Sequence, residues 1–425
     1  MSDPAKLREG GQVPGPAPGE PAVLEGVEGE ESEPSFFSQP RRIVQTLVAV
    51  LGLVIAIYFL FPEVVGLEGS LDELGKGDTT WIAIAVGFNV FAFASYVALF
   101  RGVIGEHDVR LDWRESYQIT MAGLAATRLF SAGGAGGIVL TYWALRKAGM
   151  PRAVSAQRMV AFLVLLYAVY LFALVIDGTL LRTGVLNGPN PAGLTVVPAV
   201  VAGAVIVILA LIALIPGDLE RRMAGFTRGY RFGRFVRRLA KGPAALSGGI
   251  RTALTFVRDP SRGGLAMIGA IGFWAANIGI LWASFHAFDV DVPLGVVVQG
   301  FFVGMLANLF PFAPGGVGAV DAGMIGTFVL FDLPGGKVFA AVLTYRLIAF
   351  WLPIPPGILA FIQLRRTVAR WEGERGTSSK PTDPSNTALV GAAAEREGPR
   401  SNTSESKVSS MESDHPTTEG SRVER

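Results

Sequence analysis

Four ionisable side chains stand inside strongly apolar stretches of the sequence: Arg128, Arg158, Asp321 and Arg346. An ionisable group at the centre of a bilayer costs from about 2.5 to over 10 kcal/mol, so it usually pairs with an opposite charge or lines a water-filled path. Two interpretations follow. Asp321 and Arg346 form a structural ion pair, or the arginines bind an anionic group, since a guanidinium can make two parallel hydrogen bonds to a phosphate. Arg158 lies near the start of an apolar run, where a long side chain also reaches the membrane surface.

Two of these residues, Arg128 and Asp321, stand beside glycine-rich breaks. The apolar regions 117–145 and 294–330 are interrupted by Gly133, Gly134 and Gly136 in the first, and by Pro314, Gly315, Gly316 and Gly318 in the second. Irregular backbone survives at membrane depth only where it is buried in protein or lines a wet cavity. Helix N-termini at such breaks offer free N–H groups to an anion.

The composition indicates where these residues must be held. Of 425 residues, 50% are hydrophobic and 17% are charged, and the mean hydropathy is +0.44. A soluble chain carries about 25% charged residues, so an ordinary cytosolic enzyme is excluded. The absence of Cys and the presence of only three His exclude disulfides, thiolate metal sites and a histidine-rich metal centre. We therefore expect no cofactor.

The apolar runs predict an all-α polytopic membrane protein. A helix needs about 20 apolar residues to cross a bilayer core of roughly 30 Å. Six full spans meet this length, and the two glycine-broken regions add a re-entrant hairpin or a pair of short helices each. The predicted spans are residues 43–61, 81–100, 154–176, 194–215, 265–285 and 338–362.

Loop charge fixes the expected orientation and boundaries. Residues 217–263 form a loop rich in Arg with few acidic residues, which places it in the cytoplasm by the positive-inside rule. Both termini then lie in the cytoplasm. Residues 1–40, an acidic tail, and residues 371–425 lack apolar periodicity and should be disordered, leaving 41–370 as the membrane domain. Because topology explains the basic residues, we expect no nucleic-acid partner. The glycine run also lacks the Gly-Lys-Ser/Thr ending of a nucleotide-binding loop.

The two broken regions resemble each other. The segment from Arg128 to Gly136 matches the segment from Asn308 to Gly318, and Arg158-Met-Val-Ala-Phe matches Arg346-Leu-Ile-Ala-Phe. Three predicted spans separate the breaks, so the copies would have opposite orientations. Inverted repeats with broken helices are the architecture of many transporters, whose site lies near the midplane. The alternative is a chance match between glycine-rich segments.

The second break also resembles a known family. Its sequence from Pro311 to Asp321, Pro-Phe-Ala-Pro-Gly-Gly-Val-Gly-Ala-Val-Asp, with the later Arg346 segment, is similar to the membrane region of lysylphosphatidylglycerol synthases, which defines a flippase-like family. The resemblance covers residues 43–366. The family position at Asp321 is usually Glu, one methylene longer. These synthases carry a cytoplasmic aminoacyl-transferase domain after the membrane region, where this chain has only residues 371–425, so the resemblance does not imply synthase activity.

The resemblance implies movement of a lipid between leaflets. We expect a flippase that is not an enzyme and moves a phospholipid or other polar-headed lipid, with an anionic or amphoteric head group, across the cytoplasmic membrane. The alternative is a non-transporting membrane subunit that anchors a separate lipid-modifying or envelope enzyme. The candidate lipid-binding residues are Arg128, Gly133, Gly134, Gly136, Asn308, Pro314, Gly315, Gly316, Gly318, Asp321 and Arg346.

Overall fold

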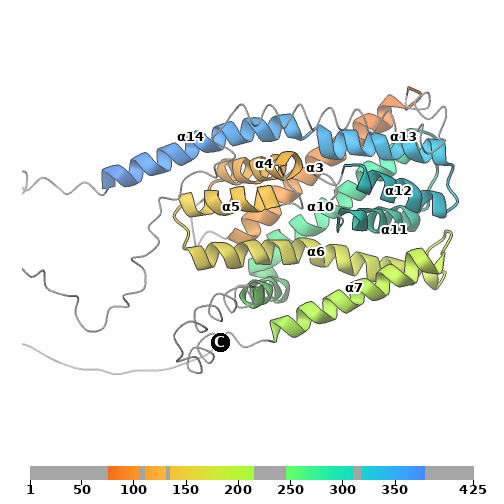
Figure 1. Cartoon of the computed structure of the whole chain (residues 1–425), viewed down its shortest axis with the longest axis horizontal. Helices are drawn as coiled ribbons and strands as arrows, with labels where there is room; N and C mark the ends of the chain where they lie inside the picture. Colours follow the sequence, from red (N-terminus) through yellow and green to blue (C-terminus); the bar gives the residue numbers. More distant parts are fainter. Residues whose placement is uncertain (1–74, 105–110, 131–134, 215–245, 310–316, 379–425) are drawn as a thin grey trace, which may run out of the picture. The chain divides into compact units, whose positions relative to one another are not determined.

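The structure, a computed structural model, describes residues 75–104, 111–130, 135–214, 246–309 and 317–378 (Figure 1). Within those ranges all regular secondary structure is helical. The predicted span 43–61, most of the basic loop 217–263 and nearly all of both tails lie outside the described residues.

Five of the six predicted spans are confirmed as helices long and apolar enough to cross a membrane. They are α3 (Thr79–Ile104), α6 (Arg152–Arg182), α7 (Ala192–Ala213), α10 (Pro260–His286) and the stretch Gly335–Glu374. The last of these has three parts, α13 (Gly335–Arg346), a π-helical turn η3 (Leu347–Trp351) and α14 (Ile354–Ser378). Pro353, Pro355 and Pro356 explain the division, since proline removes a backbone donor and clashes with the preceding turn.

The glycine-broken regions are pairs of short helices. The first consists of α4 (Trp113–Phe130) and α5 (Ala135–Lys147), and the second of α11 (Leu294–Met305), the 3-10 turn η1 (Leu306–Leu309) and α12 (Ala319–Leu330). At 1.5 Å per residue these α-helices are about 18–27 Å long, less than a bilayer core. The two helices of each region pack against each other, so we refer to them as the α4–α5 and α11–α12 hairpins (Figure 1).

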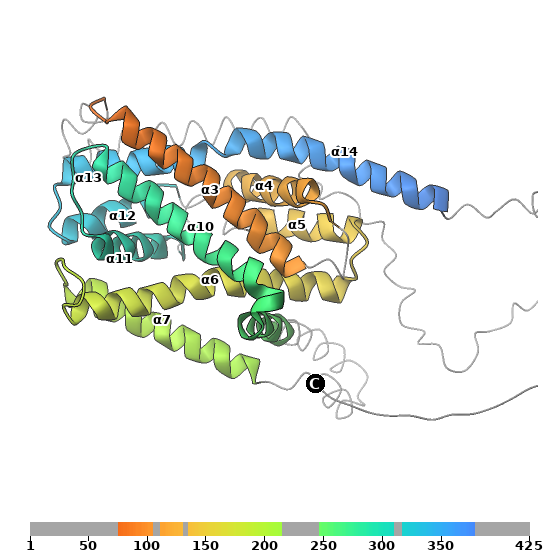
Figure 2. The ribbon, with the colours of Figure 1, turned by 180° about the vertical axis from the view of Figure 1, so that it is seen from behind.

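The same order of elements occurs twice along the chain. A long helix, a hairpin and a second long helix appear as α3, α4–α5 and α6, and again as α10, α11–α12 and α13 to α14. The two leading helices, α3 and α10, pack along each other (Figure 2). This order fits the predicted repeat, whose inverted symmetry stays a prediction.

Glycine permits the close approach of α3 and α10. A Cβ atom on Gly269 would lie 2.3 Å from the backbone nitrogen of Leu99, and one on Gly102 would lie 2.5 Å from that of Ala266. Membrane helices associate through such small residues, because lipid supplies no hydrophobic force to drive helices together. The glycine content noted in the sequence is therefore partly a packing feature.

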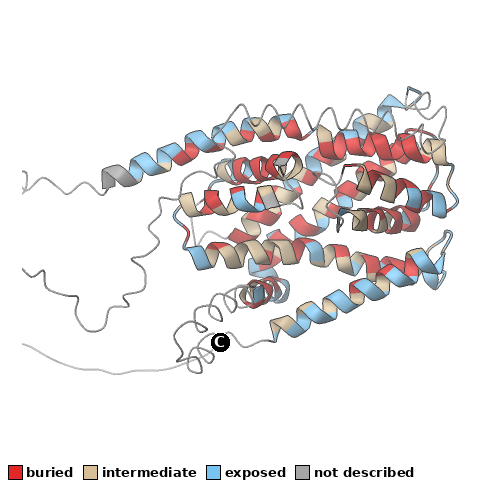
Figure 3. Cartoon of the chain, viewed as in Figure 1, coloured by how far each residue is buried: buried red, intermediate tan, exposed pale blue. Residues whose placement is uncertain are grey.

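Burial divides the helices into an interior and an apolar periphery (Figure 3). Fully buried Phe285, Phe301 and Phe328 belong to the main core, whereas α7 exposes Val200 and Leu211. An exposed apolar surface of this extent indicates contact with lipid. The outermost helix thus carries no polar face that would suit water.

The last helix extends past the boundary expected at residue 370. α14 continues to Ser378, and Trp371 Nε1 donates a hydrogen bond to Glu115 Oε1 of α4 at 3.3 Å. Lys147 Nζ of α5 lies 2.7 Å from Glu372 Oε1. These contacts hold a polar helical end that hydropathy alone assigns to a tail.

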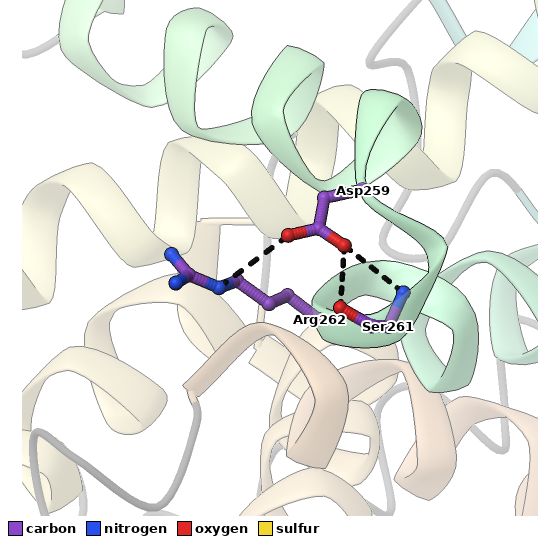
Figure 4. Close-up of polar contacts among 3 residues, drawn as sticks. All are labelled: Asp259, Ser261 and Arg262. Atoms are coloured by element: carbon purple, nitrogen blue, oxygen red, sulfur yellow. Dashed lines mark hydrogen bonds and ion pairs between the residues drawn. The ribbon is translucent and has the colours of Figure 1, made fainter. Parts of the chain in front are cut away.

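The start of α10 is capped on the side of the basic loop (Figure 4). Asp259 Oδ1 accepts hydrogen bonds from the backbone nitrogen of Ser261 at 3.1 Å and from its hydroxyl group. Arg262 Nε lies 3.4 Å from Asp259 Oδ2. The hydrogen bond from the Ser261 hydroxyl, with smaller help from Arg262, lowers the pKa of Asp259 below its usual value.

Candidate functional site

An ion pair joins the second hairpin to the last long helix. Asp321 Oδ1 on α12 lies 2.6 Å from Arg346 Nε at the end of α13, and the two side chains are 7% and 5% exposed. The ion-pair interpretation of these two residues therefore describes their geometry. Two opposite charges held this close in a low-dielectric interior stabilise each other strongly, and each would be costly without the other.

The start of α12 positions the carboxylate. Gly318 is the N-cap residue and has φ of +82°, a conformation that glycine adopts without strain. Asp321, three residues later, accepts a hydrogen bond from the Gly318 backbone nitrogen through Oδ2 at 2.8 Å. One carboxylate thus caps the helix with one oxygen and binds Arg346 with the other. The short side chain of Asp suits this double role.

Phe350 brings a second guanidinium to the ion pair. The Cζ atom of Arg346 lies 4.5 Å from the centre of the Phe350 ring, and the Cζ atom of Arg128 lies 5.3 Å from the same centre. Attraction between a cation and an aromatic ring stabilises each contact. Arg128 comes from the C-terminal turn of α4, so at this ring a residue of the first hairpin meets the arginine that pairs with Asp321 of the second hairpin.

Arg128 is held by the π-helical turn. Its Nη1 donates to the carbonyl oxygen of Phe350 at 2.8 Å, and its Nη2 donates to that of Ala349 at 2.9 Å. In a continuous α-helix the N–H of residue 353 would bond to the carbonyl of residue 349. Residue 353 is proline and has no N–H, so the Ala349 carbonyl is left for Arg128.

The cluster of Arg128, Asp321, Arg346 and Phe350, which we call the arginine cluster, carries an excess of positive charge. Asp321 compensates Arg346, whereas Arg128 contacts carbonyl oxygens and a ring but no carboxylate of the described chain. Arg128 is partly buried, whereas both members of the ion pair are buried. The accessible member of the cluster is therefore the cation that lacks an anion.

The other predicted site residues divide into three groups. Gly136 lies in the first turn of α5 and Asn308 is exposed in η1. Arg158 stacks on Phe256 instead, with its Cζ atom 5.6 Å from the centre of that ring. The remaining five lie outside the described residues, namely Gly133, Gly134, Pro314, Gly315 and Gly316.

Sequence reasoning did not single out Phe350 or the carbonyl groups that hold Arg128. The closely spaced prolines after residue 352 were the available signal, because they predict free carbonyls one turn earlier. Among the residues that the structure describes, no group of three His, Cys, Asp or Glu could hold a metal ion.

The chain is similar to membrane proteins, some of which are named for an activity on a membrane lipid. Residues 43–357 match the family model described as lysylphosphatidylglycerol synthase TM region. A "UPF0104 membrane protein" of Methanothermobacter thermautotrophicus is 22% identical over 325 residues, which are 74% of this chain and 94% of that protein. The phosphatidylglycerol lysyltransferase of Staphylococcus haemolyticus is 30% identical over 81 residues, 19% of this chain and only 10% of that protein.

Proposed function

The chain belongs to the family of the lysylphosphatidylglycerol synthase transmembrane region, and from this premise we propose that it is a lipid flippase. It moves a phospholipid or another polar-headed lipid across the cytoplasmic membrane, with both termini on the cytoplasmic side. The observation that carries the proposal is the partly buried Arg128, which has no carboxylate partner among the described residues and lies beside a buried ion pair. A lipid phosphate supplies the missing negative charge.

The arrangement of charges favours a phosphate at Arg128 rather than at Arg346. A phosphate that displaced Asp321 from Arg346 would leave a buried carboxylate without a partner, which is strongly unfavourable. Binding at Arg128 leaves the ion pair intact and neutralises the net charge of the cluster. An amine on an amphoteric head group would lie near Asp321, the acidic member of the cluster.

The hydrogen bonds of Arg128 also suit a transient ligand. A bond to a neutral carbonyl is weaker than a bond to a charged phosphate, so an arriving head group can replace one carbonyl partner. The carbonyls of Ala349 and Phe350 hold the guanidinium in place between lipid molecules. Binding and release therefore need only a small movement of one side chain.

The test is lipid translocation in proteoliposomes that contain acyl-labelled phosphatidylglycerol or phosphatidylethanolamine, with the label kept away from the head group. Arg128→Ala should slow translocation about tenfold or more, because a hydrogen bond to a charged group is worth about 1.5–3 kcal/mol. Arg128→Lys should recover part of the rate, since lysine keeps the charge but not the fork.

Arg101→Ala is the matched control. Arg101 also donates to a backbone carbonyl, that of Leu111, and stacks on an aromatic ring, that of Trp113 at 4.7 Å, but it is not part of the arginine cluster. Its loss should leave the translocation rate close to that of the wild type. Wild-type translocation at the rate of protein-free vesicles for both lipids would refute the proposal and favour a non-transporting subunit.

A further inference from the structure

A second acidic side chain is buried in the helical interior and takes no part in the arginine cluster. Asp177 lies on α6, five residues before that helix ends at Arg182, and is 8% exposed. Its Oδ2 atom accepts no hydrogen bond from the residues that the structure describes. An ionised carboxylate in such a place is costly, and uptake of a proton removes the charge.

Gln299 on α11 provides a second unsatisfied acceptor at the same helix interface. Its side chain is fully buried, and its Nε2 donates to the Leu194 carbonyl at 2.6 Å. Its Oε1 accepts no hydrogen bond from the described chain. A Cβ atom on Gly178, the residue after Asp177, would lie 3.3 Å from Gln299 Nε2.

The face of α6 that carries Asp177 is directed at α11. Tyr170, two helical turns earlier on the same face, donates its hydroxyl to the Phe302 carbonyl of α11 at 2.6 Å. Gln299 and Phe302 lie within one turn of each other on α11. We therefore assign Asp177 and Gln299 to one α6–α11 interface. This interface holds two acceptor oxygens and, for these oxygens, no donor from the described residues.

No positive charge from the neighbouring helices compensates Asp177 among the described residues. The sequences of α7 and α11 contain no titratable side chain. On α6 the Tyr170 hydroxyl is engaged with Phe302 and Arg182 is exposed, and on α10 His286 stacks against Trp81 and Trp282. The other titratable groups on α6 and on the labelled helices packed against it are Tyr96, Arg101, Tyr142, Arg146, Lys147, Arg152, Arg158, Tyr167 and Arg262.

We propose that Asp177 and Gln299 form a proton-binding site between α6 and α11, in which the protonated carboxyl group of Asp177 donates its O–H to Gln299 Oε1. One proton satisfies both orphan oxygens, because a protonated carboxyl group is a donor and the amide oxygen is an acceptor. A hard metal cation such as Mg²⁺ or Ca²⁺ takes about six or more oxygen ligands, and this interface has two unsatisfied side-chain oxygens among the described residues.

The site would give lipid movement an energy source, a step that rests on the proposed function. α11 carries Gln299 and packs against α12, which carries Asp321 of the arginine cluster. Loss of the proton breaks the bond between α6 and α11 and leaves a charge in their interface. The position of the α11–α12 hairpin therefore responds to protonation, and a proton gradient across the membrane can bias lipid movement.

The site itself is tested by infrared spectroscopy of the purified full chain at neutral pH, which needs no transport. The spectrum should contain the carbonyl stretch of a protonated carboxylic acid, and Asp177→Asn should remove it. Gln299→Leu should keep this band and move it to higher frequency, because the accepting oxygen is lost. The matched control Asp332→Asn, at an exposed position, should remove only carboxylate bands.

Two infrared results would overturn the proposal. If Asp177→Asn loses only carboxylate bands, Asp177 is ionised in the wild type. If the Asp177 band appears or disappears when choline replaces sodium in the buffer, the site binds sodium.

The coupling is tested in proteoliposomes by the ratio of translocation rates with and without an imposed pH gradient. This ratio should differ from one in the wild type and return to one in Asp177→Asn.

The two tests separate the two proposals. An acid band without any lipid movement would leave the proton site standing and remove the flippase function. Lipid movement without the acid band would support the flippase function and refute the proton site. A pH-gradient ratio that is the same in Asp177→Asn and in the wild type would refute the coupling, whatever the infrared result.

Discussion

The two hairpins share their construction and differ in charge. Both are pairs of short helices that meet at small residues: Gly137 of α5 packs against Gly123 of α4, and Gly304 of α11 packs against α12 at Met324. The matched sequence segments align Gly136 with Gly318, so the position of Asp321 corresponds to Val139. Val139 is 47% exposed, whereas Asp321 is buried in an ion pair.

The difference assigns separate roles to the two halves. In the second half the two buried charges balance, because Asp321 forms an ion pair with Arg346. In the first half, Arg128 pairs with no carboxylate of the described residues, and its guanidinium crosses to the carbonyls of the second half. A common scaffold thus holds an ion pair on one side and, on the other, an arginine bound to neutral carbonyls, where we propose that a ligand anion binds.

The largest effect should come from breaking the balanced pair. Asp321→Ala leaves Arg346 buried without its carboxylate and removes the cap on α12, which should destabilise the protein by about 3–5 kcal/mol. Thermal unfolding in detergent measures the change. The double variant Asp321→Ala/Arg346→Met should recover much of the loss, because an apolar replacement leaves no buried charge. A single variant as stable as the wild type would contradict the importance of the pair.

The close packing of the hairpins should give the next largest effect. A Cβ atom on Gly137 would lie 2.4 Å from the Gly123 carbonyl oxygen, and one on Gly304 would lie 2.7 Å from the Cα of Met324. Alanine at either position should destabilise by about 1–3 kcal/mol through overpacking. Gly326→Ala is the control, since beyond its chain neighbours and the backbone of its own helix no atom of the described residues lies within 4 Å of its Cβ position. Equal stability of all three variants would show that the hairpins do not depend on these contacts.

Removal of Arg158, the residue that matches Arg346 in the first half, should have a smaller effect. Its stacking on Phe256 is a cation–π contact, and such a contact is worth about 0.5–1 kcal/mol at an exposed site. Arg158→Ala should therefore lower stability far less than Asp321→Ala and leave lipid translocation close to the wild-type rate. A loss as large as that of Asp321→Ala would mean that the two halves are electrostatically alike.

The smallest effect concerns the cap at Asp259, outside both hairpins. The pKa of Asp259 is lowered in the folded protein, chiefly by the Ser261 hydroxyl, so the cap stabilises the fold above the unfolded-state pKa of the carboxyl group. This stabilisation is lost as the pH falls through the folded-state pKa. Asp259→Ala should therefore be slightly less stable than the wild type at neutral pH and equal to it in acid. A difference that persists in acid would exclude the charge as its cause.

The sequence predicted the fold because hydropathy and loop charge report directly on the membrane. Long apolar runs located five helices that the structure describes, and glycine breaks located both hairpins. The pairing of Asp321 with Arg346 was one of two interpretations that the sequence allowed, since each is an ionisable residue in an apolar run. The contacts of Arg128 with Ala349 and Phe350 were not foreseen, because they join helices more than 200 residues apart through backbone carbonyls.

Asp177 shows that a span boundary predicted from hydropathy can leave out a buried polar residue of the same helix. The predicted span ended at residue 176, where hydropathy falls, and so left out the carboxylate of Asp177. The helix continues to Arg182, and Asp177 lies on its buried face with Tyr170 and Leu174. The helical period carries the missing information, since residues three and seven apart share one face.

The central claim is that Arg128 is the anion-binding member of the arginine cluster. The most direct measurement is native mass spectrometry of the protein after gradual delipidation in phosphatidylglycerol-containing micelles. The wild type and Arg101→Ala should retain a bound phosphatidylglycerol that Arg128→Ala loses at the same collision energy. Retention of this lipid by Arg128→Ala to the same extent as by the wild type would contradict the claim.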